Sequence, residues 1–117
     1  MDAAALAMVM EALTCGVTGC VEWEPKEAYR LRSDKFLKGL TPESIQQDLI
    51  SYVTNEGGEV VQIEEKRPQY SYRVYWYKVI VPYPDLFRLG LFVELELFEA
   101  DPDCPVVHLL NAHEQTS

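Results

Sequence analysis

The hydrophobic pattern in the last third of the chain predicts an antiparallel sheet. Segments rich in Val, Ile, Tyr, Trp and Phe follow one another at residues 70–81, 90–99 and 106–112, and Pro, Gly and Asp occupy the gaps between them. This composition is typical of half-buried strands that are separated by turns. An alternating segment at residues 59–65 adds a further strand, so we expect a meander of about four antiparallel strands.

Alternation along the strands separates the two faces of this sheet, because successive side chains point to opposite sides. A continuously apolar row, which we expect in the core, comprises Leu91, Val93, Leu95 and Leu97. The opposite row carries two carboxylates and is expected to be partly exposed; it comprises Phe92, Glu94, Glu96 and Phe98. Arg73 or Lys78 of the preceding strand is expected to pair with one of these carboxylates across the sheet.

The polar and apolar positions of residues 41–55 predict the main helix. Thr41 is placed as its N-cap, Pro42 occupies the first helical position and Glu43 complements the helix dipole. A single apolar stripe that would face the sheet comprises Ile45, Leu49, Tyr52 and Val53. Two glycines at residues 57–58 then end the helix.

The amino-terminal segment, residues 1–33, is predicted to contain a helix followed by irregular chain. Residues 2–13 are dominated by Ala, Leu and Met, which favours a helix. Because this helix is apolar nearly all round, it either packs beneath the sheet or contacts another chain, for example in a homodimer. Residues 21–23 are expected to be extended, and a short helical turn is expected at residues 34–38.

Together these elements predict a single α+β domain. A chain of 117 residues has the size of one domain. Helices that precede a run of strands are typical of folds in which helices pack on one side of a sheet. We therefore expect two to three short helices on one face of an antiparallel sheet, with residues 34–117 forming the main helix and the meander.

The charge distribution restricts the classes of partner. A net charge of −9 argues against a generic nucleic-acid binder, which would need Lys and Arg to displace counterions from phosphate. No cation follows Arg88, whereas six carboxylates do: Glu94, Glu96, Glu99, Asp101, Asp103 and Glu114. A basic face and an acidic face on one domain would suit a partner of either sign.

The three cysteines, Cys15, Cys20 and Cys104, have no spacing typical of a zinc site and are expected to be reduced thiols of a cytoplasmic protein. Residues 17–20 resemble the small-residue box that precedes the modified cysteine of bacterial lipoproteins, but the start of the chain lacks the positive charge of an export signal. No apolar run approaches the roughly 20 residues that span a bilayer, so no membrane segment is expected. Nothing in the sequence indicates a metal or a cofactor.

A series of short motifs runs through residues 38–82. It comprises a Gly-Leu-Thr-Pro-Glu helix start at 39–43, a strand that holds Gln62, an Arg-Pro step at 67–68 and a Tyr-Lys-Val-Ile-Val segment at 77–81. This order resembles the MqsR family of bacterial toxins and the wider group of RelE-like small ribonucleases. The resemblance implies a domain that cleaves messenger RNA without a metal and that a cognate antitoxin protein holds inactive.

The same resemblance implies a set of catalytic residues. Gln62 matches the family's strand glutamine, Tyr75 or Trp76 matches its tyrosine, and His113 stands near the place of a carboxy-terminal basic residue. Metal-free RNA cleavage needs a base, an acid and cations that neutralise the phosphorane. His113 titrates near neutrality and would serve as base or acid, although a solvated side chain near the chain end is the alternative. The cations that would hold the phosphate are Arg67, Arg73 and Lys78.

A second hypothesis is a non-catalytic acidic interaction module, an inhibitor or adaptor, that presents its carboxylate-rich strands to a basic partner. It explains the net charge directly. The aromatic run from Tyr70 to Tyr77 suits both hypotheses, because it would stack bases or line a protein groove. A concave cluster of Arg67, Arg73, Lys78 and His113 would favour the ribonuclease, and the dispersal of these residues would favour the interaction module.

Overall fold

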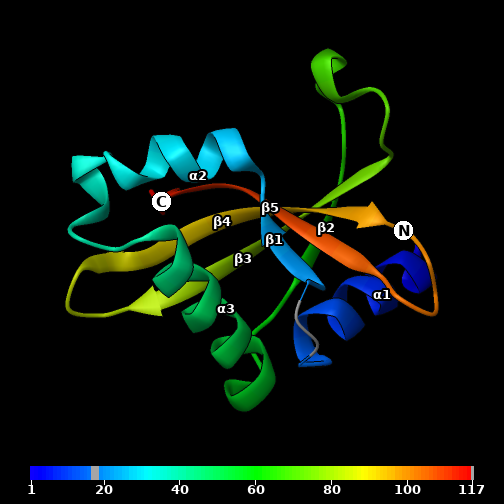
Figure 1. Ribbon diagram of the computed structural model, residues 1–117, viewed down its shortest axis with the longest axis horizontal. Helices are drawn as coiled ribbons and strands as arrows, with labels where there is room; N and C mark the ends of the chain where they lie inside the picture. Colours follow the sequence, from blue (N-terminus) through cyan, green and yellow to red (C-terminus); the bar gives the residue numbers. More distant parts are fainter. Residues whose placement is uncertain (17–18, 117) are drawn as a thin grey trace.

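The computed structural model describes residues 1–16 and 19–116, and it confirms the α+β class. Its sheet has five strands rather than about four: β1 (Val21–Trp23), β2 (Val61–Glu64), β3 (Tyr75–Tyr83), β4 (Phe87–Glu99) and β5 (Val106–Glu114). They lie in the order β1-β5-β4-β3-β2, and every neighbouring pair is antiparallel except β1 and β5. Figure 1 shows the helices α1 (Ala3–Thr14) and α3 (Pro42–Glu56) on one face of this sheet.

Helix α3 begins and ends where its sequence predicts. The Thr41 hydroxyl accepts a hydrogen bond from the backbone N–H of Ser44 (3.1 Å), and the Ser44 hydroxyl accepts one from the N–H of Thr41 (3.0 Å). This reciprocal capping satisfies two N–H groups that have no partner inside the helix. Gly57 stops the helix in the left-handed region, with φ of 68°.

Helix α1 packs against the sheet, which is the first of the two alternatives for its apolar surface. Val9, Ala12 and Leu13 are buried in the core, and the Asp2 carboxylate caps the helix by accepting from the N–H of Ala5. The predicted homodimer contact through this helix stays a prediction. No helix among the described residues combines the length and the apolarity needed to cross a membrane.

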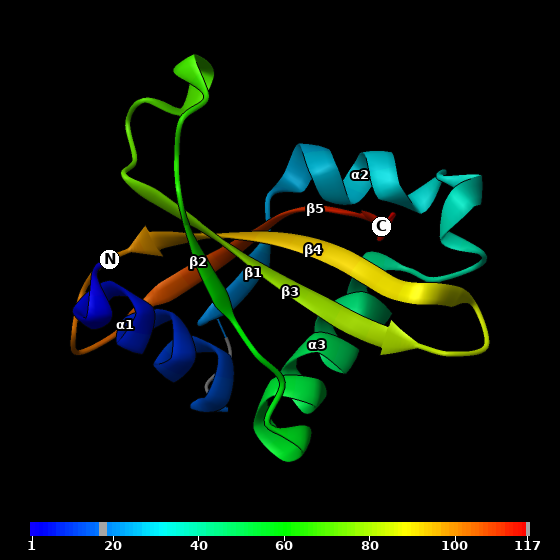
Figure 2. The ribbon, with the colours of Figure 1, turned by 180° about the vertical axis from the view of Figure 1, so that it is seen from behind.

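Helix α2 (Pro25–Arg32) occupies part of the segment that was expected to be irregular. Pro25 stands at the first helical position, where its missing N–H costs nothing, and the Glu24 side chain caps the helix. The helix runs beside the carboxy-terminal part of β5 (Figure 2), where Arg30 donates to the Asn111 side chain at 2.8 Å. The predicted helical turn nearby is the short 3₁₀ helix η1 (Lys35–Leu37).

The shortest strand, β1, is the extended segment expected at residues 21–23. It pairs in parallel with β5, with Val21 opposite Val107 and Trp23 opposite Leu109. The Trp23 indole donates to the carbonyl oxygen of Pro42 at 2.7 Å, which ties this edge of the sheet to the start of α3. The lipoprotein-like box at residues 17–20 lies partly outside the described residues, because it includes Val17 and Thr18.

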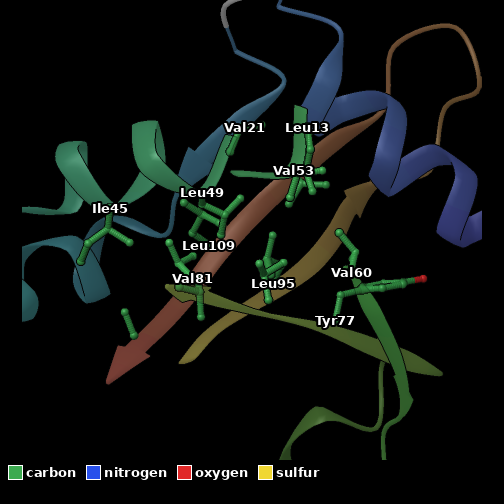
Figure 3. Close-up of a cluster of buried hydrophobic side chains, with 14 of the residues drawn as sticks. Leu13, Val21, Ile45, Leu49, Val53, Val60, Tyr77, Val81, Leu95 and Leu109 are labelled. Carbon is green, nitrogen blue, oxygen red and sulfur yellow. The ribbon is translucent and has the colours of Figure 1, made fainter. Parts of the chain in front are cut away.

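The core lies between the sheet and helices α1 and α3. Leu91, Val93 and Leu95 are completely buried, as predicted for their row, whereas Leu97 at the end of the row is only half-buried. Figure 3 shows Leu95 of β4 and Leu109 of β5 close to Leu49 of α3. The other buried side chains from the strands include Tyr77, Val79, Val81, Val107 and Ala112.

The predicted strand at residues 70–81 is wrong at its beginning. The strand β3 starts only at Tyr75, and a 3₁₀ helix, η2 (Pro68–Tyr70), followed by a turn occupies the preceding residues. The backbone N–H of Glu65 donates to the carbonyl of Val74 at 2.8 Å and closes this connection at its base. Residues 65–74 therefore form an arm, which projects from the sheet in Figure 2.

Candidate functional site

The arm at residues 65–74 carries most of a buried charge network. The network comprises Glu65, Arg67, Arg73, Glu94 and Glu96. Arg67 binds Glu65 with both Nε and Nη2, at 2.8 and 3.0 Å, and also reaches Glu94 at 3.1 Å. Arg73 lies 3.1 Å from Glu94, 3.4 Å from Glu65 and 3.6 Å from Glu96. The arm therefore attaches to β4 through ion pairs.

This network overturns the expectation that the row of Glu94 and Glu96 is partly exposed. Only 6% of Glu94 and 9% of Glu96 is exposed, because the arm covers them and its arginines neutralise them. The predicted pairing of Arg73 with these carboxylates is confirmed, but Arg73 approaches from the arm and not from a neighbouring strand. Lys78 is the residue that faces Glu94 in the strand register.

Aromatic rings hold the two guanidinium groups in place. The Tyr70 ring centroid lies 4.5 Å from the Cζ atoms of both Arg67 and Arg73. Arg67 also lies over Trp76 at 5.2 Å, and Arg73 lies near the Tyr72 ring at 5.8 Å. Contacts of this kind between cations and ring faces add attraction and fix the orientation of the guanidinium plane.

The electrostatics of the network follow from these contacts. The hydrogen bond from Arg67, together with the charge of Arg73, holds the pKa of the Glu65 carboxyl below its ordinary value in spite of burial. The same contact with Glu65 raises the pKa of Arg67. Three carboxylates and two guanidinium groups leave a formal charge of −1. The network therefore offers no net positive charge for a phosphate.

An open groove of about 570 Å³ lies beside the network on the outer face, the face of the sheet opposite α1 and α3. Its lining includes Glu24, Tyr72, Arg73, Glu96, Phe98 and His108. We call it the aromatic groove, because the Phe98 and His108 rings stack at 3.8 Å and Tyr72 stands across from them. Phe98 is 55% exposed and Tyr72 is 68% exposed, which is unusual for rings of this size gathered in one place.

The floor of the aromatic groove contains an incompletely satisfied cation. The Arg73 side chain is only 8% exposed, yet its Nε and Nη1 atoms have no hydrogen-bond partner among the described residues. The 3.6 Å separation between Nη1 and Glu96 is too long for a hydrogen bond. Buried donors without an acceptor cost about 1–3 kcal/mol each. An acceptor atom brought by a ligand would remove this cost.

Gln62 and Tyr75, two of the three predicted catalytic residues, lie on the core side of the sheet. Gln62 is buried, and its amide donates to the Tyr77 hydroxyl (3.0 Å) and to the backbone carbonyl of Asp2 (2.9 Å). It also accepts from the N–H of Asp2 at 2.9 Å, so its hydrogen bonds hold the start of α1. Tyr75 packs against the edge of the core cluster.

His113, the third predicted catalytic residue, lies on the outer face. Its ring is exposed and stacks on Phe92 at 4.6 Å, and Phe92 in turn contacts Trp76 at 6.0 Å. Two aromatic rings thus stand between His113 and the guanidinium of Arg67. Among the predicted phosphate-binding residues, the structure brings Arg67 and Arg73 together and leaves Lys78 outside their network. The predicted catalytic residues are not gathered in one site.

Several residues of the aromatic groove were not predicted as site residues from the sequence. Glu24 and Phe98 belong to segments that only the fold brings together, since β1 enters the sheet beside β5. The signal that was available is the aromatic run that includes Tyr72, which was assigned to a strand. Glu65 was likewise not singled out, because its partners Arg67 and Arg73 approach it only when the arm closes.

A second cavity, of about 670 Å³, opens at the other side of the β1 edge, between α1, α2 and α3. Its polar side chains are engaged within the protein. Trp23 donates to Pro42, Gln46 donates to the carbonyl of Val21 at 2.9 Å, and Arg32 pairs with Glu43. This cavity therefore offers a ligand fewer unused polar groups than the aromatic groove does. Within residues 1–16 and 19–116, no three His, Cys, Asp or Glu side chains are placed to hold a metal ion.

Comparison with known proteins finds no family model, no curated protein and no solved structure that matches this chain.

Proposed function

We propose that this protein is a non-catalytic interaction module that binds a basic segment of another protein in the aromatic groove. The observation that carries the proposal is the separation of His113 and Lys78 from the two neutralised arginines. Arg67 and Arg73 are neutralised by three carboxylates, and two aromatic rings separate them from His113. A ribonuclease would need these groups around one phosphate.

The aromatic groove has the chemistry that a lysine or arginine side chain requires. The exposed faces of Phe98 and Tyr72 would cover its aliphatic stem and attract its charge. Glu22 lies near the groove, with its carboxylate 3.9 Å from His108, and its side chain is 58% exposed. Glu22 would therefore pair with the ammonium or guanidinium group of the bound side chain in place of its longer contact with His108.

The backbone of the bound segment has a partner as well. The Tyr72 ring lies near Arg73 and is itself mostly exposed, so it can move without disturbing the core. A main-chain carbonyl that enters beside the shifted ring would accept from the unsatisfied N–H groups of Arg73. The net charge of −9 favours the approach of a basic partner over the whole surface.

The test is binding of a defined library of fluorescent dodecapeptides, one half rich in Lys and Arg and the other half rich in Asp and Glu. We expect basic peptides to bind, and binding to weaken as salt is added. Phe98→Ala is expected to reduce the affinity about tenfold or more, as for loss of an aromatic anchor. The matched control is Phe36→Ala, because Phe36 is an 84% exposed ring on η1 outside the groove lining.

Equal binding of acidic and basic peptides, or equal loss in the Phe98 and Phe36 variants, would contradict the proposal. The ribonuclease hypothesis is tested in parallel with mixed-sequence RNA in the presence of chelator. Cleavage by the parent protein that disappears in His113→Ala would replace the interaction module by the enzyme.

A further inference from the structure

The fold brings Cys104 near Cys15 and Cys20, which are only five positions apart in the sequence. Cys15 follows the last turn of α1, Cys20 directly precedes β1, and Cys104 lies in the connection between β4 and β5. The Sγ atoms of Cys15 and Cys20 are 3.2 Å apart. Cys104 lies close enough to Cys20 to contribute to raising the pKa of its thiol. Cys20 is therefore the centre of a cluster of three thiols.

The three thiols differ in exposure. Cys15 and Cys104 are exposed, whereas only 5% of Cys20 is accessible. The pKa of Cys20 is raised to about 11, chiefly by the hydrogen bond with Cys15 and next by burial. Cys20 therefore remains a protonated thiol at neutral pH, and a thiolate rather than a thiol is the nucleophile towards an oxidant. An oxidant from solution would meet one of the exposed cysteines first.

We propose that this cluster is a site of reversible oxidation by peroxides, in which Cys15 and Cys20 close a disulfide. In the first step the Cys15 sulfur attacks one oxygen of the peroxide, the O–O bond breaks, and Cys15 becomes a sulfenic acid while the peroxide leaves as water or an alcohol. In the second step the Cys20 thiol gives up its proton to the sulfenic hydroxyl of Cys15 as the Cys20 sulfur attacks the Cys15 sulfur. The hydroxyl group leaves with the Cys20 proton as water.

In total, two thiols and one peroxide give one disulfide and two molecules of water. With an organic peroxide, one of the two water molecules is replaced by an alcohol. The thiols lose two electrons, which the peroxide takes up. The geometry favours the second step, because a disulfide bond is about 2.05 Å long and the sulfur atoms need to approach by only about an ångström. Cys104, which lies near Cys20, is the thiol that takes the place of Cys15 when Cys15 is absent.

The bond would have a specific structural effect. It would join the carboxy-terminal end of α1 to the start of β1 across the connection between them. Leu13 and Val21, which flank this connection, and Gly19 within it also line the cavity at the β1 edge. Oxidation would therefore restrain one wall of that cavity, on the side of the sheet away from the aromatic groove, so the proposal is independent of the proposed function.

The test is treatment of the purified protein with hydrogen peroxide, followed by alkylation of the remaining thiols and mass mapping of peptides. We expect an intramolecular Cys15–Cys20 disulfide, two hydrogen atoms lighter than the dithiol, which dithiothreitol reduces again. The Cys104→Ser variant is expected to retain this disulfide. The Cys15→Ser variant is expected to lose it and to form a Cys20–Cys104 disulfide in its place.

Cys15 is exposed, so the Cys15→Ser variant is expected to keep the fold, which circular dichroism would verify. The proposal is overturned if Cys20 is still a thiol after Cys15 and Cys104 have become sulfinic acids. Disulfides that join two chains in place of the internal one would overturn it as well.

Discussion

The guanidinium of Arg73 lies 3.1 Å from the carboxylate of Glu94, which is 21 positions further along the chain, and both side chains are 8% exposed. One partner belongs to the arm and the other to the centre of the sheet. A buried pair of this kind is held together by mutual attraction, but each partner has lost its hydration. The removal of either partner therefore leaves a charge that water can no longer stabilise.

Replacement of Arg73 by Met is expected to reduce the free energy of unfolding by about 3 kcal/mol, because Glu94 and Glu96 remain buried with only part of their partners. Urea denaturation measures this change. The matched control is Arg32→Met, since Arg32 pairs with Glu43 at the surface, where an ion pair contributes at most about 1 kcal/mol. Similar losses in the two variants would show that the network does not hold the arm.

Acid is expected to destabilise the protein in part through Glu65, whose pKa is held below its ordinary value chiefly by Arg67. The unfolded chain binds this proton at a higher pH than the folded protein does. The contribution of Glu65 is therefore present above its ordinary pKa of 4.5 and is lost as the pH falls through the lower folded pKa.

The Arg67→Leu variant is expected to lack much of this contribution. Its loss of stability relative to the parent protein should be largest at neutral pH and should shrink in acid. Urea titrations between about pH 7 and pH 3 measure the difference. A difference that stays constant over this range would exclude Arg67 as the cause of the shift.

Gln62 is expected to stabilise the start of α1 and not to take part in catalysis. Gln62→Leu removes the hydrogen bonds with Asp2 and Tyr77, and a loss of about 1–3 kcal/mol is expected because their buried partners are left unsatisfied. Hydrogen exchange should increase in the first turns of α1. Gln47→Leu, on the exposed side of α3, serves as the control with little expected effect.

Two leucines of β4 test the burial of its central row. Leu95 is completely buried, so Leu95→Ala is expected to cost about 2–5 kcal/mol through lost contacts and a residual cavity. Leu89 on the same strand is 44% exposed, and Leu89→Ala is expected to cost well under half as much. Thermal melts of the two variants provide the comparison. Equal losses would contradict the burial of the Leu91–Leu95 row.

Elements whose determinants are local were predictable from the sequence. The helix predicted at residues 41–55 is observed at Pro42–Glu56, because its cap, its first proline and its final glycine are all local signals. The core row of β4 was predictable because the alternation of apolar residues has the period of a strand. Helix α2 lies in the segment that was expected to be irregular, although Pro25 stands at its first helical position.

Features that depend on tertiary contacts were not predictable. Residues 70–74 have the aromatic composition of a strand, but they fold into the arm because Arg67 and Arg73 bind carboxylates elsewhere. For the same reason the burial of Glu94 and Glu96 could not be foreseen from their charge. The proximity of Cys104 to Cys20 likewise depends on the arrangement of β1, β4 and β5.

The parallel pairing of β1 with β5 affects how this protein folds during its synthesis on the ribosome. Val21 can pair with Val107 only after Val107 has been synthesised, so β1 cannot join the sheet before β5 is present. Contacts between such distant positions form slowly, because a long loop must close before they are made. Nascent chains that lack β5 therefore keep the edge of β1 and the apolar side of α1 open to other chains. Synthesis of β5, rather than emergence of the first helix, is therefore expected to allow productive folding.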